Sequence, residues 1–304
     1  MTAKQRFLCP VHILFAIALA IVLIPGKGTD KYGVYLVGFL LILEALTLAV
    51  SAFVKKKPSL DVFLDIIGFL YVFLGGWTLA TVKLKLLREA LFPPFGTILH
   101  QFVEDRDKIA VNIASSVGII IQGFLLAVVV AIPLGLVIAS NLRAGNAATY
   151  ITKFFSSIPP IVYIPYGIAL LPTFRSVSVF VIFLASFWPV FASTMSGVMS
   201  VDKKVLDSAK VLNVSKPTML FEILLPASLG QIFLGCNQGL SVSFILLTSA
   251  EMIGARDGMG YYVKNYSDFG DYTRTIVGLL VIGGVVIAVT FLVGRLQKFL
   301  LRWR

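Results

Sequence analysis

The chain has 304 residues, of which 58% are hydrophobic and only 13% are charged, and its mean hydropathy is +0.93. This composition excludes an ordinary soluble domain and a disordered chain, and two cysteines are too few for a disulfide scaffold. The net charge of +11 would suggest nucleic-acid binding in a soluble protein, but in a polytopic membrane protein it indicates basic cytoplasmic loops. We therefore expect a chain embedded in a lipid bilayer, with no nucleic-acid partner.

Eight apolar stretches are candidates for transmembrane helices, since a spanning helix needs roughly 20 mostly apolar residues. They lie at about residues 7–24, 32–54, 60–82, 109–140, 150–171, 177–200, 223–253 and 273–300. The fifth stretch carries Pro159, Pro160 and Pro165, so we expect it to be bent or interrupted. The expected fold is an all-α, polytopic membrane helix bundle with about eight transmembrane helices.

Composition also divides the chain into three regions. Residues 1–82 are expected to form an N-terminal extension of three membrane helices, and residues 109–304 the core. Between them, residues 83–108 mix apolar and charged side chains around a Pro93-Pro94 break, which predicts an interfacial amphipathic segment with a short surface helix. The glycines within 254–272 predict a turn-rich external loop. The distribution of Lys and Arg predicts cytoplasmic termini and a cytoplasmic loop at 201–222.

The sequence offers little that could carry enzymatic chemistry. His12 and His100 are isolated, and no nucleophile motif, metal-ligand cluster or phosphate-binding Walker A sequence is present. We expect no catalytic residue, no metal site and no cofactor bound by this chain. Any ATP that drives its activity would be bound by a partner subunit.

Four acidic residues, Glu44, Asp61, Asp65 and Glu251, fall in or near the predicted spans. An ionisable group costs at least about 2.5 kcal/mol in the hydrocarbon region, so each is a candidate for a functional role. Asp61 and Asp65 lie near a span's end, which favours a position at the level of the headgroups. For Glu44 an interhelical hydrogen bond and a functional role are equally compatible with the sequence.

Glu251 belongs to a polar stripe on the seventh predicted span. At about 100° per residue, the stripe covers an arc of roughly 80°. Its members are Asn237, Ser241, Thr248 and Glu251, and Phe244 lies on the same arc. The stripe is the wall of a water-filled path or a seam of interhelical hydrogen bonds, and we expect Glu251 to border such a path near the external face. No Arg or Lys is evident within the core spans.

The loop at 200–222 contains two short helical patterns. Apolar residues recur at helical spacing up to Asn213, and a second helix can begin at Ser215 with Pro217 in its first turn. Asn213 therefore lies at a junction where a left-handed backbone is expected, and Asn tolerates that conformation best after Gly. Such a loop is either a simple connector or a plug for a groove on a partner.

The spacing of this loop resembles that of ABC importer permeases. Their cytoplasmic loop reads EAA, three residues, Gly, nine residues, then I-x-L-P; here Asp207-Ser208-Ala209 is followed at the same spacing by Asn213 and by residues 223–226, Ile-Leu-Leu-Pro. With IPP at 158–160 and AEMIGARDGMGYYV from Ala250, residues 93–304 are similar to permeases of the nitrate, sulfonate, taurine and bicarbonate type. The chain departs from them in Asp207, Ser208 and Asn213 themselves. It also departs in an apolar position near Ile119, where such permeases often carry a basic residue, and in having three N-terminal spans instead of one.

The resemblance implies a type I importer core in a bacterial inner membrane. It implies a second permease copy, which would make a homodimer, a cytoplasmic ABC ATPase dimer that binds ATP, and an external substrate-binding protein. The loop would be the coupling helix, with Val205, Leu206 and Leu212 as apolar anchors. The residues expected to couple to the ATPase are Asp207, Ser208, Ala209, Leu212, Asn213, Ser215 and Pro226.

The resemblance also implies a small solute, such as nitrate, a sulfonate, taurine or a related anion. Two alternatives remain open at this stage. A secondary carrier driven by ion gradients would use Glu44, Asp65 or Glu251 as its ion site. A scaffold without transport activity would use only the 200–222 loop.

Overall fold

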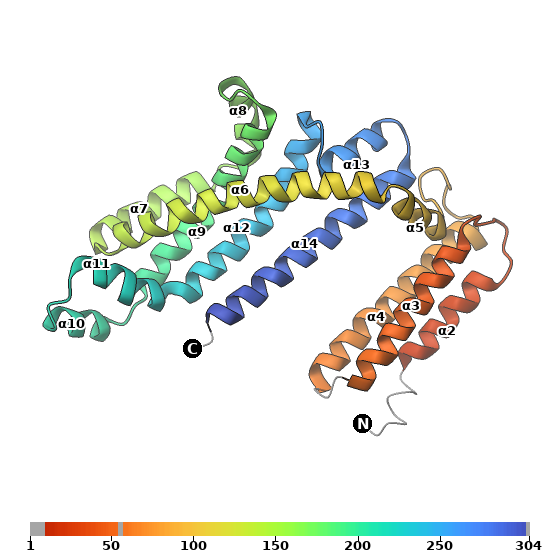
Figure 1. Cartoon of the computed structure of the whole chain (residues 1–304), viewed down its shortest axis with the longest axis horizontal. Coiled ribbons are helices and arrows are strands. Elements are labelled where there is room, and N and C mark those ends of the chain that lie inside the picture. The colour runs from red at the N-terminus through yellow and green to blue at the C-terminus, as the bar shows by residue number, and fades with distance from the viewer. Residues whose placement is uncertain (1–9, 54–56, 302–304) are drawn as a thin grey trace. The chain divides into compact units, whose positions relative to one another are not determined.

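The computed structural model describes residues 10–53 and 57–301, and within these ranges the secondary structure is entirely helical (Figure 1). The N-terminal helices are α2 (Pro10–Leu23), α3 (Gly33–Phe53), α4 (Lys57–Thr78), the π-helical turn η1 (Leu79–Lys83) and α5 (Phe95–Glu104). They are followed by α6 (Arg106–Ala139), α7 (Leu142–Ser156), the 3₁₀ turn η2 (Pro160–Tyr163), α8 (Ile164–Leu170) and α9 (Phe174–Met199). The chain continues with α10 (Lys203–Val211), α11 (Lys216–Thr218), the π-helical turn η3 (Met219–Leu224), α12 (Leu225–Gly254), α13 (Met259–Asp268) and α14 (Tyr272–Leu300).

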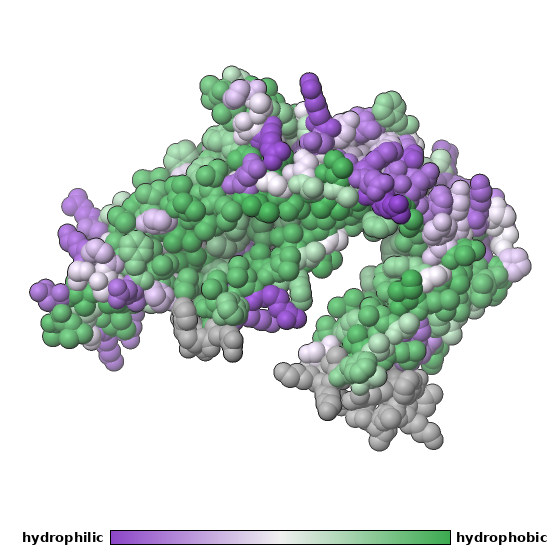
Figure 2. Space-filling model, viewed as in Figure 1, coloured by the Kyte–Doolittle hydropathy of each residue, from purple (hydrophilic) through white to green (hydrophobic). Residues whose placement is uncertain are grey.

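The chain divides into two compact units. Unit 1 comprises residues 1–108 and 265–279, and unit 2 comprises residues 109–264 and 280–304. In both units the exposed surfaces of the long helices are largely apolar, as expected for helices that contact lipid (Figure 2). Hydrophilic residues gather at helix ends, including those around α10 and α11 in unit 2.

Unit 1 is held together by contacts among its first helices. Tyr71 of α4 is fully buried, and its ring packs against Phe15 of α2. The Lys83 ammonium group donates to the carbonyl oxygens of Val22 and Ile24, which are left without partners where α2 ends. A cation at a helix C-terminus also interacts favourably with the helix dipole. This contact therefore holds η1, which follows α4, against the end of α2.

Unit 2 is built on the contact between α9 and α12, which run antiparallel and pack along much of their lengths. Small residues allow this approach: a Cβ atom at Gly235 would lie 2.6 Å from Ser193 Cβ and 2.7 Å from the Pro189 carbonyl oxygen. Ser186 and Ser243 share a buried hydrogen bond of 2.7 Å across the same contact. Close packing at small residues, supported by interhelical hydrogen bonds, is how helices associate where water is absent.

Six helical stretches in the described ranges are long and apolar enough to cross a membrane, and not the eight expected. They are Gly33–Phe53, Ser59–Lys83, Arg106–Ala139, Phe174–Met199, Lys216–Gly254 and Tyr272–Leu300. The first predicted span contains α2, whose 14 residues form a shorter apolar helix, and its residues 7–9 lie outside the described part of the chain.

The interruption predicted within 150–171 is confirmed, and none of the helices in this stretch is long enough to span a membrane. Helix α7 ends at Ser156, and the chain resumes as the four-residue turn η2 and the seven-residue helix α8. Pro159 and Pro160 explain the break, because each lacks a backbone N–H and constrains the residue before it.

Two other sequence expectations have different outcomes. The short helix expected within 83–108 is confirmed as α5, which begins directly after Pro94. The turn-rich loop expected over 254–272 is only partly correct, because 259–268 form the helix α13. Met259, Tyr262 and Val263 are buried, so packing of one apolar face outweighs the helix-weakening effect of the nearby glycines.

Candidate coupling loop and translocation path

The loop between α9 and α12 folds as the two helices that the sequence predicted, and a side chain caps the N-terminus of each. Asp202 caps α10 by accepting a hydrogen bond of 2.9 Å from the Lys204 N–H. Ser215 caps α11, with Pro217 in the first turn, where a missing N–H has no cost. Pro226 lies in the first turn of α12, directly after the π-helical turn η3, where the backbone hydrogen-bond pattern changes.

Asn213 joins the two helices in a left-handed conformation, with a φ of +50°, which confirms the prediction for this position. Its N–H donates to the Lys210 carbonyl oxygen, and the next N–H, of Val214, donates to the Ala209 carbonyl oxygen. These bonds satisfy carbonyl groups that would otherwise be unpaired at the end of α10. The turn therefore stops α10 after nine residues and redirects the chain into α11.

One side of α10 holds the loop to unit 2, and the other projects from it. Ala209 is 4% exposed, and Leu206 packs against the core cluster that includes Met195 and Leu224. Val211 and Leu212, by contrast, are 85% and 76% exposed. Leu206, which is partly buried, helps to seat α10 on unit 2, and a contact of Val205, Leu206 or Leu212 with a partner stays a prediction.

The two polar residues of the motif have local partners. The Asp207 carboxylate is exposed and lies 3.5 Å from the Lys210 ammonium group one turn later. Ser208 Oγ donates to the Lys204 carbonyl oxygen. An exposed pair of this kind contributes little to stability, so Asp207 is available to a docking partner.

On α12 the predicted polar stripe is used mainly for hydrogen bonds within unit 2. Asn237 donates to Gln297 of α14 at 3.2 Å, while the hydroxyl groups of Ser241 and Thr248 donate to carbonyl oxygens of their own helix. Phe244 is buried. Ser241 is exposed, and Asn237 and Thr248 are partly exposed. That this face lines a path stays a prediction.

Glu251 connects three elements of unit 2. One carboxylate oxygen accepts a hydrogen bond of 2.6 Å from Ser116 Oγ of α6, and the other accepts one of 2.7 Å from the N–H of Gly260 in α13. Ser116 Oγ in turn accepts from the Met259 N–H. Glu251 is 1% exposed, so its carboxylate is enclosed by these partners. A role for it at the border of a path remains a prediction.

The turn between α12 and α13 is fitted closely around this carboxylate. Gly258 has a φ of +121°, and a Cβ atom there would lie 2.4 Å from Glu251 Cδ. Its N–H donates to Asn112 of α6 at 2.7 Å. Only glycine satisfies both the backbone conformation and the lack of space at this position.

The remaining candidates lie in unit 1. Glu44 shares a hydrogen bond of 2.5 Å with His12 Nδ1 and accepts one of 3.0 Å from the Tyr71 hydroxyl group, so it links α3 to both α2 and α4. This geometry supports the structural interpretation of Glu44. His100 stacks on the Tyr32 ring. Asp61 and Asp65 are exposed on α4.

Comparison with known proteins gives one family. Residues 131–304 match the family described as "Binding-protein-dependent transport system inner membrane component". The chain is 30% identical over 233 residues to a probable ABC transporter permease protein of Brucella abortus (strain 2308), a match that covers 76% of this chain and 92% of that protein.

Two further relatives have more specific names. The nitrate import permease protein NrtB of Synechocystis sp. is 29% identical over 198 residues, which are 64% of this chain and 72% of that protein. The bicarbonate transport system permease protein CmpB of Synechococcus elongatus is 26% identical over 216 residues, 71% and 76% of the two chains.

The chain belongs to this permease family. It is a multi-pass subunit of the inner membrane and part of a binding-protein-dependent ABC importer. The matched residues include the whole α9–α12 pair, the loop that contains α10 and α11, and the turn that surrounds Glu251.

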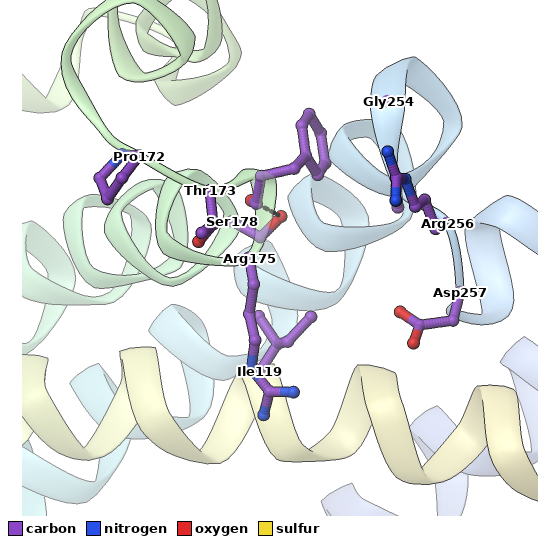
Figure 3. A pocket seen from close by; sticks show the side chains of 10 residues that line it. Ile119, Pro172, Thr173, Arg175, Ser178, Gly254, Arg256 and Asp257 are labelled. Carbon is purple, nitrogen blue, oxygen red and sulfur yellow. Dashed lines mark hydrogen bonds between the residues drawn. The ribbon is translucent and has the colours of Figure 1, made fainter.

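The permease has a pocket of about 520 Å³ at the end of the α9–α12 pair that is remote from α10. Its wall is formed by the start of α9, the turn after α12 and Ile119 of α6. In Figure 3 the Arg175 side chain extends from α9 towards Ile119, and the Asp257 carboxylate points into the pocket. Arg256 lies beside Gly254 on the turn.

The sequence analysis missed both arginines of this pocket. The sixth span was expected to begin at Val177, whereas α9 begins at Phe174 and includes Arg175. Hydropathy excludes a charged residue at a span's edge, so it could not reveal this one. A basic residue just before an apolar run, together with the GARDGMG turn, was the available signal.

Proposed function

We propose that this permease forms the translocation path for a small anionic solute and couples it to ATP hydrolysis by a cytoplasmic ATPase. The observation that carries the coupling role is the geometry of α10, which is seated by Leu206 and Ala209 while Val211 and Leu212 project. An exposed apolar tip on a short, capped helix is suited to docking in a groove of another protein.

In this proposal the loop acts as a rigid connector. ATP-driven closure of two ATPase subunits would bring two docked loops together, and the helices that carry them would tilt between inward-open and outward-open states. Lys203, Lys204, Lys210 and Lys216 would meet acidic residues at the rim of the groove.

The proposed assembly contains two copies of the permease, an ABC ATPase dimer and an external binding protein. The permease itself has no catalytic role and holds no cofactor, because ATP is bound and hydrolysed by its partner. Both termini and the 201–222 loop lie in the cytoplasm. Nitrate, a sulfonate, taurine or a related anion is the proposed class of solute, supported by the names of the nitrate and bicarbonate permeases among its relatives. No observation favours the ion-gradient carrier.

The direct test is to purify the tagged permease from its native membrane in mild detergent, identify the accompanying proteins by mass spectrometry and assay ATP hydrolysis. We expect an ATPase with Walker motifs to be recovered with the wild-type chain. It should be lost with Ala209→Asp, because a carboxylate in place of the buried methyl group would lift α10 from its seat.

The matched control is Ala144→Asp, the same substitution at an exposed position in the first turn of α7. It should leave ATPase recovery unchanged, since a carboxylate at a helix N-terminus is favourable. A chain that is recovered alone and takes up solute only when an ion gradient is present would contradict the proposed function. Ala209→Asp that retains both the ATPase and solute-stimulated hydrolysis would contradict the coupling role of α10.

A further inference from the structure

Two arginines, Arg175 and Arg256, line the pocket at the start of α9. The described residues provide neither Arg175 nor Arg256 with an ion pair or a hydrogen bond to its guanidinium group. Arg274 of unit 1 is a useful contrast, because its guanidinium group is bound by Asp105 at 2.6 Å and by Asp271 at 2.8 Å. Arg274 is thus neutralised by its own fold, whereas the charges of Arg175 and Arg256 are not.

Arg175 is positioned by its helix to face the pocket. Its Nη2 atom lies 3.6 Å from the position that a Cβ atom would take at Gly118, so its side chain crosses from α9 to the surface of α6 (Figure 3). Thr173 caps α9 two residues earlier by accepting from the Ser176 N–H, which fixes the first turn from which Arg175 projects.

The charge balance of the pocket is positive. Two arginines and a single acidic residue, Asp257, line it, and the Asp257 carboxylate accepts a hydrogen bond of 2.9 Å from Ser115 Oγ of α6. Guanidinium groups bind carboxylates, sulfonates and similar oxyanions through paired, charge-assisted hydrogen bonds.

The rest of the wall is suited to an apolar group. Ile119, Pro172 and Phe174 contribute side chains to the lining, and the pocket volume of about 520 Å³ is within the range of sites that hold small organic molecules. We infer that this pocket receives an organic oxyanion, a small sulfonate or carboxylate, with its charged head at Arg175 and its apolar body against Phe174 and Ile119. The inference rests on the proposed transport function and narrows its class of solute.

The position of the pocket also fits the direction of import. It is formed where α9 begins and where α12 ends, and α10 connects the opposite ends of these two helices. A solute bound at this pocket therefore enters the α9–α12 pair at the side remote from the ATPase. Arg175 would bind the arriving solute, and Arg256 at the rim would raise the local concentration of anions.

The first experiment measures protection of the arginines in the purified permease–ATPase complex in nanodiscs. Phenylglyoxal modifies accessible arginines, and mass spectrometry gives the rate for each one. Butanesulfonate and nitrate are the probes, at equal ionic strength. We expect butanesulfonate to slow modification of Arg175 about tenfold, as one charge-assisted contact would, and nitrate to slow it less. Arg143, which is exposed on α7, is the internal control and should react at an unchanged rate.

Three results would overturn the inference. One is equal protection of Arg143, which would indicate only a general effect of salt, and another is equal protection by nitrate, which would remove the role of the apolar wall. The third is protection by the external binding protein in the absence of butanesulfonate, with no protection by butanesulfonate itself, because the pocket would then bind a carboxylate of that protein and not the solute.

The second experiment measures ATP-driven uptake of butanesulfonate by proteoliposomes that contain the complete importer. Arg175→Gln should lower uptake about tenfold at limiting solute, whereas Arg175→Lys, which keeps the charge, should retain most of it. Arg143→Gln removes an equal charge outside the pocket and should have no effect. If the wild-type importer takes up butanesulfonate and Arg175→Gln does so at the same rate, the anion pocket is contradicted, whereas the proposed transport function is not. If the wild-type importer transports no solute with ATP, the proposed function fails, and the protection experiment still decides whether the pocket binds an oxyanion.

Discussion

Glu251 determines how the turn after α12 is held against α6, because both of its carboxylate oxygens accept hydrogen bonds from other elements. Removing the side chain would leave Ser116 and the Gly260 N–H without their acceptor and would open a cavity beside Gly258. Unsatisfied buried donors and cavities are among the largest sources of destabilisation by single substitutions.

We therefore expect Glu251→Ala to lower the free energy of unfolding in detergent by roughly 3 kcal/mol. Glu251→Gln should lose much less, since an amide oxygen can still accept and its NH₂ group can donate to Ser116 Oγ. Thermal unfolding monitored by circular dichroism measures the difference, with Ser241→Ala as a control at an exposed hydroxyl group. Normal uptake by Glu251→Gln would leave Glu251 a structural residue, and loss of uptake with full stability would favour the path.

Asn213 sets the angle between α10 and α11 through its positive φ. Asn213→Pro cannot adopt this conformation, because the proline ring holds φ near −65°. We expect Asn213→Pro to bind the ATPase weakly and to reduce solute-stimulated ATP hydrolysis about tenfold or more, while the membrane helices stay folded.

The matched variant is Asn213→Gly, which reaches the left-handed region without strain and should retain coupling. Hydrolysis by the reconstituted complex, with circular dichroism to verify the helices, separates a loss of coupling from unfolding. Equal hydrolysis by both variants would mean that the geometry of this turn does not matter.

Helices α9 and α12 depend on the absence of side chains where they cross. Gly235→Leu would place its side chain into Ser193 and the Pro189 backbone, so we expect the helices to separate and the stability of unit 2 to fall by about 2 kcal/mol or more. Gly284→Leu is the control, because no atom lies within 4 Å of a Cβ at that position of α14. The rate at which the buried thiol of Cys236 reacts with a maleimide reports the opening of this contact.

Local patterns predicted local structure well. The motif spacing and the caps located the turn at Asn213 and the helix start after Ser215, because the residues that determine a turn lie within it. The α13 helix was missed because its stability depends on burial of Tyr262 and Val263 against distant parts of the chain. The interruption within 150–171 was predictable, because Pro159 and Pro160, which cause it, lie within the segment itself.

For the candidate site, too, local patterns were predictable and contacts between distant residues were not. Spacing was sufficient to propose the coupling residues, and helical periodicity placed Glu251 on a polar face. Neither could reveal that Ser116 would donate to its carboxylate, or that Arg175 and Arg256 would share a pocket, since these pairs are far apart along the chain. The bond from the Gly260 N–H, nine residues away, depends on the turn at Gly258.

At the scale of the whole molecule, the proposed orientation can be tested at the two ends of unit 2. Val211 is 85% exposed on α10, and Arg256 is exposed on the turn after α12. In a background without Cys9 and Cys236, and in vesicles that lack the ATPase, Val211→Cys should react with an impermeant maleimide only when the vesicles are inside-out, and Arg256→Cys only when they are right-side-out. The reverse pattern would invert the proposed topology and would place α10 out of reach of a cytoplasmic ATPase.

The loop that contains α10 and α11 joins the adjacent ends of α9 and α12, so a displacement of this loop acts on both helices at the same end. Helix α9 has 26 residues, and at 1.5 Å per residue it is about 39 Å long. Because α9 and α12 are packed together, a force applied at α10 rotates both as one body. A tilt of about 10° displaces the distal end by about 7 Å, more than the width of a solute's charged head group. If α10 docks on the ATPase as proposed, a tilt of this size would move Arg175 and Arg256 by several ångströms with no change in the internal structure of either helix.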